Sequence, residues 1–297
     1  MKTLLRHSGK WVPGGAPGVY VTRAAGAAAA AAELGGDPRI ESITISNEYV
    51  TVALTHDALV RGALDVALNE ITSDALRGST VPDAPPADLA TAPDWKTARA
   101  ELARELTAKL ARAAGATLSP QPREKTADTK TSDRSVEKAL EFAGADAVRF
   151  ALASMRPGSK PPDPQWTARH VLGNPAYAVR YAHAAAAAVL RWAGTEPGAT
   201  SAAGFRPSRL TEPGELVLLD ALSWLPERVT VAARRGRPDE FARYVEMLAT
   251  KTIGTMSTTG FTTGPAISTE RLWLARAART GLGAGLGLLG ITAPDRI

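Results

Sequence analysis

The first part of the chain alternates apolar and polar residues in a way that predicts strands. Residues 40–45 and 50–54 each place an apolar side chain at about every second position, and a polar triplet separates the two runs. This pattern predicts a hairpin of half-buried strands. Helices are predicted at 24–34 and after Asp57, which we expect to cap the second helix. Residues 1–71 are therefore predicted to form a small α/β domain.

A helical period replaces this alternation further along the chain. Between 94 and 114 apolar residues recur every three or four positions, with Arg and Glu on the other face, which predicts an amphipathic helix. The flanking stretches 72–93 and 117–134 are rich in Pro, Asp and Thr. Dense prolines disfavour both helix interiors and sheet ladders. Residues 72–134 are therefore predicted to be a linker that contains one helix.

Residues 135–297 show helical periodicity throughout, broken by Gly and Pro. The predicted helices are 135–143, 145–154, 164–171, 174–193, 213–223, 225–234, 238–257 and 268–287. The fold class is thus mainly α. It comprises a C-terminal helical bundle preceded by a small α/β domain and a linker region.

Composition narrows the class of protein. Hydrophobic residues make up 44% of the 297 residues and charged residues 22%, which is typical of a soluble globular protein. The alanine runs are too short to span a membrane, and the first residues lack a signal-peptide core. Cysteine is absent, which excludes disulfides and thiolate metal sites. We therefore expect a cytoplasmic protein with no membrane contact, no bound metal and no cofactor.

Charge divides unevenly along the chain. The net charge is +5, and from Ser135 onward 19 Lys and Arg face 14 Asp and Glu, so the whole excess lies in the helical half. Most of these cations are arginines, which bind phosphates bidentately. One interpretation is a nucleic-acid-binding surface. The other is an ordinary solvated surface, because the excess is smaller than that of a dedicated basic stripe.

Four stretches of the helical half resemble motifs of class I arginyl-tRNA synthetases, in the order that the family has them. They are 144–150, 174–184, 243–249 and 271–297. The second is similar to the family's N-P-x-Y-x-x-Q-Y-A-H-A-R helix, and the fourth to its L-L-G-I-x-A-P-E-x-M ending. The resemblance implies a DALR-type anticodon-binding bundle over 135–297. It also implies that residues 18–70 resemble the family's small domain that contacts the outer corner of the tRNA.

The catalytic signatures of that family are missing. Its Rossmann domain carries an H-x-G-H motif and a K-M-S-K-S-type loop, whose charges stabilise phosphoryl oxygens in the transition state. None of the four histidines lies in such a motif, and 130–134 is at most a vestige of the lysine loop. The helix at 94–114 resembles the one that follows the first signature, but no complete Rossmann domain fits in the linker. We therefore predict no catalytic residues and no independent arginine–tRNA ligase activity.

The glycine-rich run 281–287 allows two interpretations. It could be a phosphate-binding loop, or it could allow close packing of a helix. Its position inside the last helical pattern favours close packing.

Candidate RNA-binding residues follow from residue type and from the resemblance. Unpaired bases stack on aromatic or guanidinium planes, and phosphates bind arginine. The candidates are Arg149, Tyr177, Arg180, Tyr181 and His183, followed by Arg243, Tyr244, Arg271 and Arg276. Tyr177 and Tyr181 lie one helical turn apart, with Arg180 beside them. The alternative is that the tyrosines and His183 are core residues with satisfied polar atoms.

Departures from the family pattern leave the function open. Residues 251–257 replace an aromatic-rich stretch, Arg180 replaces a glutamine, and Ile297 replaces the terminal methionine. The first hypothesis is a non-catalytic paralogue that binds tRNA, such as an arginine-accepting tRNA, or a tRNA-like RNA, as an accessory, carrier or regulatory factor. The alternative is a scaffold that binds a synthetase or pathway enzyme and has lost RNA binding. A third hypothesis is an enzyme that binds ATP and arginine between the domains.

Overall fold

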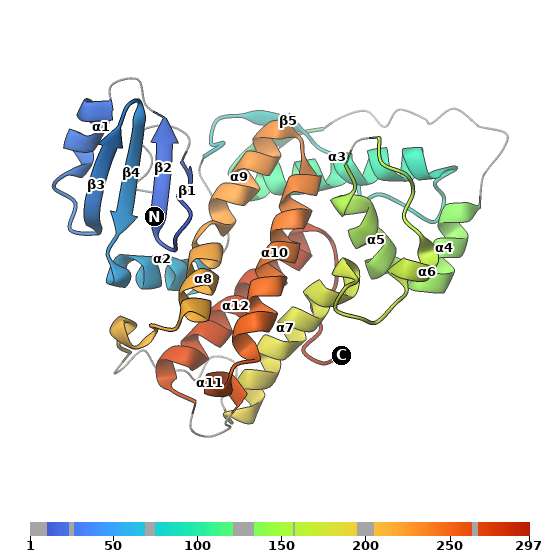
Figure 1. Cartoon of the computed structure of the whole chain (residues 1–297). Coiled ribbons are helices and arrows are strands. Elements are labelled where there is room, and N and C mark those ends of the chain that lie inside the picture. The colour runs from blue at the N-terminus through green and yellow to red at the C-terminus, as the bar shows by residue number, and fades with distance from the viewer. Residues whose placement is uncertain are drawn as a thin grey trace.

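A computed structural model describes residues 11–23, 27–68, 75–120, 134–156, 158–194, 205–262 and 267–297. A small sheet lies at one side of a large group of helices (Figure 1). The predicted fold class, mainly α with a small α/β part ahead of a helical bundle, is confirmed. Residues 24–26 of the first predicted helix and 130–133 of the lysine stretch lie outside the described residues.

The sheet has four antiparallel strands. Its order is β1 (Val12–Pro13), β2 (Val19–Arg23), β4 (Tyr49–Leu54) and β3 (Ile40–Ser46). The predicted hairpin of β3 and β4 is confirmed, with Ile43 opposite Val52. Asn47 adopts φ 54° in its turn, a left-handed conformation that asparagine tolerates better than most residues.

Two helices accompany the sheet. They are α1 (Ala27–Leu34) and α2 (His56–Leu68). The expectation that Asp57 caps α2 is wrong, because Thr55 Oγ1 accepts the backbone N–H of Ala58 at 3.3 Å. Asp57 lies inside the first turn and pairs with Arg61 at 2.6 Å. Thr55 therefore has the capping role, two residues earlier than the sequence suggested.

The predicted linker contains a compact β–α–β unit. Its elements are β5 (Thr80–Pro82), α3 (Trp95–Ala113) and β6 (Thr117–Ser119), and the two strands are parallel. Asp94 caps α3 by accepting the N–H of Thr97 at 2.7 Å. The helix was predicted, but the two strands were not, since three residues cannot show a period. Helix α3 packs against α9 and α5, so this region is joined to the bundle.

The remaining helices form the bundle. They are α4 (Ser135–Ala143), α5 (Ala145–Ser154), α6 (Pro164–Thr167), α7 (Pro175–Trp192), α8 (Pro213–Ser223), α9 (Leu225–Arg235), α10 (Pro238–Met256), α11 (Thr259–Thr262) and α12 (Thr269–Leu288), with a 3-10 turn at Pro207–Arg209. The predicted bounds agree within one residue, except that the helix expected at 164–171 ends at Thr167. Its end is fixed by Asn174, whose side-chain amide donates to the carbonyls of Thr167 and Arg169 at 2.9 and 2.6 Å.

Helices α7, α10 and α12 pack against one another at the centre, and α2 packs on α8 and α12. The sheet is anchored to the bundle at Asp220 on α8, whose carboxylate accepts the N–H of Gly18 at 3.1 Å and the hydroxyl of Tyr20 at 3.2 Å. The Tyr20 ring also lies 5.1 Å from the ring of Trp224. These contacts fix the small α/β part against the bundle.

Close helix packing explains two of the glycines in 281–287. A Cβ added at Gly281 would lie 2.9 Å from Leu222 Cδ2, and one at Gly285 would lie 3.1 Å from Val245 Cγ2. Both glycines are on α12, and both lie against other helices of the bundle. The packing interpretation of this run is therefore confirmed.

We expect Gly281→Val to lower the free energy of unfolding by about 1–3 kcal/mol, because the added methyl groups overpack the α8–α12 contact. Gly287→Ala is the matched control, since nothing lies within 4 Å of its added Cβ. It should raise stability by about 0.5–1 kcal/mol, because alanine restricts the unfolded chain. Urea unfolding measures both. Equal effects of the two substitutions would contradict the assignment.

Candidate nucleic-acid interface

Three aromatic rings stack in a row near the start of α7. The His170 and Tyr177 rings have centroids 5.4 Å apart at 14°, and the Tyr177 and Tyr181 rings are 5.8 Å apart at 29°. His170 is exposed and both tyrosines are half-buried. We call His170, Tyr177 and Tyr181 the ring ladder. Such a row offers flat apolar surface to a further planar group.

Local structure explains why the ladder forms. Tyr177 and Tyr181 are one turn apart on α7, so their side chains share a face. Asn174 caps the helix by accepting the N–H of Ala176 at 3.1 Å, and its amide holds the carbonyl of Arg169. This contact turns the preceding segment back toward α7. His170 is thereby placed on Tyr177.

Two arginines, Arg169 and Arg180, neighbour the ladder residues in the sequence. Arg180 Nε lies 3.7 Å from Asp146 Oδ2, and the Arg180 side chain is 31% exposed. Asp146 also accepts hydrogen bonds from the hydroxyl and N–H of Thr292. The Arg169 guanidinium lies over the Trp166 ring at 5.6 Å. Arg180 is held by a partly exposed carboxylate and Arg169 by a ring, so both guanidiniums are able to bind a phosphate.

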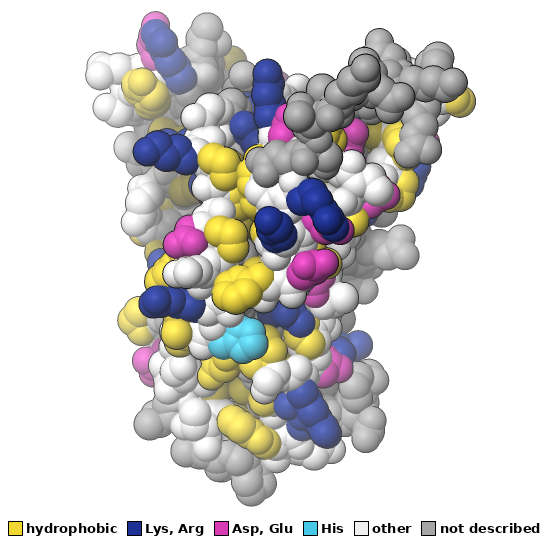
Figure 2. Space-filling model, turned by 90° about the vertical axis from the view of Figure 1, so that its right-hand side faces the viewer, with side chains coloured by type: hydrophobic (Ala, Val, Ile, Leu, Met, Phe, Trp, Pro, Cys, Tyr) yellow, Lys and Arg dark blue, Asp and Glu magenta, His cyan; other side chains and the backbone are white. Residues whose placement is uncertain are grey.

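The face of the molecule shown in Figure 2 carries hydrophobic side chains, a histidine and dispersed basic side chains, with acidic ones between them. This mixture resembles a stacking surface more than a continuous basic stripe. A mixed surface agrees with the small excess of positive charge in residues 135–297.

Two of the predicted site residues, Arg149 and His183, form contacts within the fold. Arg149 Nε donates to the carbonyl of Leu289 at 2.8 Å, its guanidinium pairs with Glu105, and the side chain is 14% exposed. His183 is 4% exposed, and its Nδ1 lies 2.9 Å from the carbonyl of Pro294. Burial holds the pKa of His183 below its usual value. Both residues hold the C-terminal segment in place, which corrects their assignment to a ligand surface.

The second-rank candidates are distributed over other contacts. Tyr244 is 5% exposed, and its hydroxyl donates to the carbonyl of Ala221 at 2.5 Å. Burial raises the pKa of this hydroxyl far above its usual value, so Tyr244 is a core residue and its nomination is corrected. Arg243 pairs with Asp239 at 2.8 Å.

On α12, Arg271 pairs with Glu215 at 2.7 Å and lies 5.8 Å over the Phe261 ring. Arg276 lies 5.1 Å over the Trp273 ring. The structure therefore brings Tyr177, Arg180 and Tyr181 together and leaves the other candidates with separate partners within the described residues.

Comparison with known proteins identifies the C-terminal part. Residues 179–297 match the family described as the DALR anticodon binding domain. These residues form a DALR anticodon binding domain. Among curated relatives, the arginine–tRNA ligase of Kineococcus radiotolerans is 36% identical over 168 residues, and that of Micrococcus luteus is 34% identical over 170 residues. The matches cover 54% and 53% of this chain but only 30% of each relative.

Two solved structures are similar at lower levels. One is described as an arginyl tRNA synthetase from Campylobacter jejuni, with a TM-score of 0.48 and 13% identity, over 86% of this chain and 59% of that chain. The other is the Thermus thermophilus arginyl-tRNA synthetase, with a TM-score of 0.45 and 19% identity, over 99% and 57%.

The DALR anticodon binding domain contains Arg180 and Tyr181, and the match begins two residues after Tyr177. Sequence reasoning missed His170, because it placed this residue inside a predicted helix. The available signal was Asn174-Pro175, a strong helix start that implies a chain reversal just before it.

Groups of three or more metal-ligating side chains are absent among the described residues. No helix among them is long and apolar enough to cross a membrane.

Proposed function

We propose that the chain binds an RNA with unpaired bases, tRNA first among them, through the ring ladder and the adjoining face of the DALR anticodon binding domain. The ladder itself carries the proposal, because a row of stacked rings that ends in the exposed His170 can be extended by an unstacked base. Each base stacked on an aromatic side chain contributes about 1–3 kcal/mol.

Arg180 supplies the phosphate contact in this proposal. Its nearest carboxylate oxygen is 3.7 Å away, beyond hydrogen-bonding distance, and the carboxylate is partly exposed. A phosphate can therefore replace Asp146 as the partner of the guanidinium at low cost. Asp146 keeps Arg180 oriented beside the tyrosines until the RNA arrives.

A tRNA is the favoured RNA because the curated relatives are arginine–tRNA ligases and the matched family is described by anticodon binding. The role we propose is that of an accessory, carrier or regulatory factor, with an arginine-accepting tRNA as the first candidate. A non-catalytic role is supported by the short reach of the match, 30% of each relative. It is also supported by the segment from Asp83 to Asp94, between β5 and α3, which contains no histidine.

Fluorescence anisotropy with labelled tRNA over a salt series tests the proposal. We expect the affinity to fall linearly with salt on logarithmic axes, because phosphate contacts release counterions. An isolated anticodon stem-loop should compete, and an RNA duplex of the same length should compete poorly. Equal competition by the duplex would contradict base stacking at the ladder. A charging assay with arginine and ATP should give no arginyl-tRNA, and product formed by the purified chain would overturn the non-catalytic role.

A further inference from the structure

The segment that follows α12 lies against α7 and ends beside it (Figure 1). Contacts fix this segment at two points. Arg149 Nε donates to the carbonyl of Leu289 at 2.8 Å. His183 Nδ1 lies 2.9 Å from the carbonyl of Pro294. Thr292 is exposed and lies between the two fixed points, so its place relative to α5 and α7 is set by the fold.

The carboxylate of Asp146 is held by Thr292. Asp146 lies in the first turn of α5. Its Oδ1 accepts the N–H of Thr292 at 3.3 Å, and its Oδ2 accepts the Thr292 hydroxyl. Two donors from one residue fix both the position of a carboxylate and the plane of its oxygens. The Asp146 side chain is therefore oriented by the C-terminal segment.

Arg180 on α7 faces the same carboxylate without a hydrogen bond to it. The Arg180 Nε atom lies 3.7 Å from Asp146 Oδ2, which is beyond hydrogen-bonding distance. This nitrogen is buried, and within the described residues no acceptor bonds to it. A buried donor without an acceptor is unfavourable, so a carboxylate that was free to move would be drawn toward the guanidinium. The contacts of Asp146 with Thr292 account for the longer distance.

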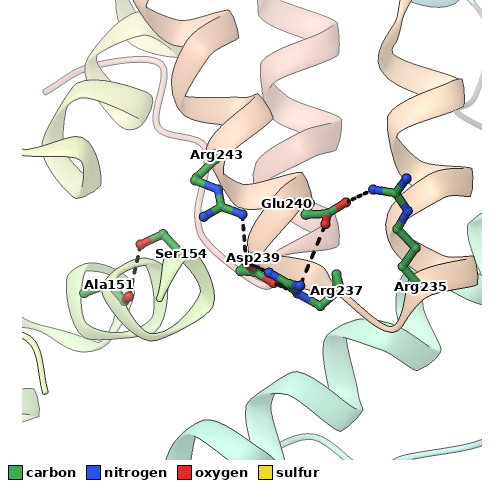
Figure 3. A network of polar contacts seen from close by, with 7 residues as sticks. All are labelled: Ala151, Ser154, Arg235, Arg237, Asp239, Glu240 and Arg243. Carbon is green, nitrogen blue, oxygen red and sulfur yellow. Dashed lines mark hydrogen bonds and ion pairs between the residues drawn. The ribbon is translucent and has the colours of Figure 1, made fainter. Parts of the chain in front are cut away.

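An aspartate at the α9–α10 turn shows the closed arrangement (Figure 3). Asp239 accepts a hydrogen bond from Arg237 Nε at 2.7 Å and one from Arg243 Nη2 at 2.8 Å. In the described part of the chain, the side chains that donate to Asp239 are these two arginines. Asp146 has the same carboxylate, but Thr292 donates to both of its oxygens and its arginine stays farther away. The comparison indicates that the threonine sets the longer distance.

We propose that Thr292 is a positioning residue, which holds Asp146 back so that the Arg180 guanidinium stays available to a phosphate of the RNA. When the hydroxyl of Thr292 releases the carboxylate, Asp146 closes on Nε and competes with the phosphate. The C-terminal segment thereby controls a contact on α7. This inference rests on the proposed function, in which Arg180 binds an RNA phosphate, and it adds the residue on which that contact depends.

Thr292→Val tests the proposal, because it removes the hydroxyl and keeps the size of the side chain. By anisotropy with labelled tRNA, we expect binding about two- to fivefold weaker, the range of a partly exposed ion pair, and a salt slope reduced toward that of Arg180→Ala. Thr292→Ser should keep most of the affinity, because it keeps the hydroxyl. Adding Asp146→Ala to Thr292→Val should recover part of the loss, because the competing carboxylate is gone. Thr250→Val is the matched control, since it removes an exposed hydroxyl that bonds within α10.

A measurement without RNA separates this proposal from the proposed function. The Nε–H proton resonance of Arg180, assigned by its loss in Arg180→Ala, should move downfield in Thr292→Val, because a hydrogen bond to a carboxylate deshields the proton. It should return when Asp146→Ala is added. An unmoved resonance overturns the proposal, as does a loss of affinity that Asp146→Ala leaves unchanged or that Thr250→Val reproduces. If the resonance moves as expected but the wild type binds no tRNA, the positioning by Thr292 is supported and the RNA-binding function alone fails.

Discussion

Replacing Arg149 with alanine is expected to lower the free energy of unfolding by about 3–5 kcal/mol, because it leaves the carboxylate of Glu105 buried without its main partner. Glu105 is 2% exposed. Its carboxylate is held by the Arg149 guanidinium, by Lys109 Nζ at 2.7 Å and by the N–H of Ala87 at 2.9 Å. The same guanidinium also holds the carbonyl of Leu289. The substitution therefore removes the polar contacts that join α3, α5 and the residue that follows α12.

Urea unfolding measures this effect, and two variants isolate its cause. Lys109→Ala removes a cation that is 37% exposed and should cost only about 0–1 kcal/mol. Glu105→Gln combined with Arg149→Ala should recover part of the loss, because the stranded charge is gone. If Arg149→Ala and Lys109→Ala lose the same amount, the buried pair is not the cause.

The dependence on pH gives a further check on Arg149. Burial alone would raise the pKa of Glu105, but hydrogen bonds from Arg149, Lys109 and Ala87 hold it below its usual value. Its stabilising contribution is then present above the unfolded pKa of about 4.3 and is lost as the pH falls through the lower folded pKa. In Arg149→Ala, the effect of burial on the pKa of Glu105 is opposed by fewer hydrogen bonds. The difference in free energy of unfolding between the wild type and Arg149→Ala should therefore become smaller as the pH is lowered.

Features set by nearest neighbours in the chain were predictable. The bundle helices followed from apolar spacing of three and four residues and from Gly and Pro at their ends, and their bounds agree closely. Features set by distant partners were not. The strands β5 and β6 lie before and after α3 in the sequence and pair with each other. The early end of α6 also escaped prediction, because it depends on one side chain, that of Asn174, which donates to the carbonyl of Thr167. Neither pairing leaves a period in the sequence.

The same distinction applies to the candidate site. Tyr177, Arg180 and Tyr181 lie on one turn of one helix, so their proximity follows from helix geometry alone. Arg149, His183 and Tyr244 were nominated by residue type and by the resemblance, and neither carries information on burial. Their partners, Glu105, Pro294 and Ala221, lie far away in the sequence. A polar side chain can serve a ligand or the core, and only the tertiary contacts distinguish the two.

Replacing both Tyr177 and Tyr181 with alanine is expected to weaken RNA binding by about fivefold to 150-fold, which corresponds to about 1–3 kcal/mol for one base stacked on the ladder. The corresponding phenylalanine variants should bind almost as the wild type does, because they keep the rings and lose only hydroxyls. Anisotropy with labelled tRNA gives the affinities. Trp192→Ala is the matched control, since Trp192 is 61% exposed at the opposite end of α7 from the ladder.

The salt dependence separates stacking from charge at the same surface. The tyrosines carry no charge, so the double alanine variant should keep the wild-type slope of log affinity against log salt while losing affinity. Arg180→Ala should reduce that slope by about one, since it removes one phosphate contact. If the tyrosine variants change the slope as Arg180→Ala does, the rings act by positioning Arg180 and no base stacks on them. If they change neither slope nor affinity, the RNA does not touch the ladder.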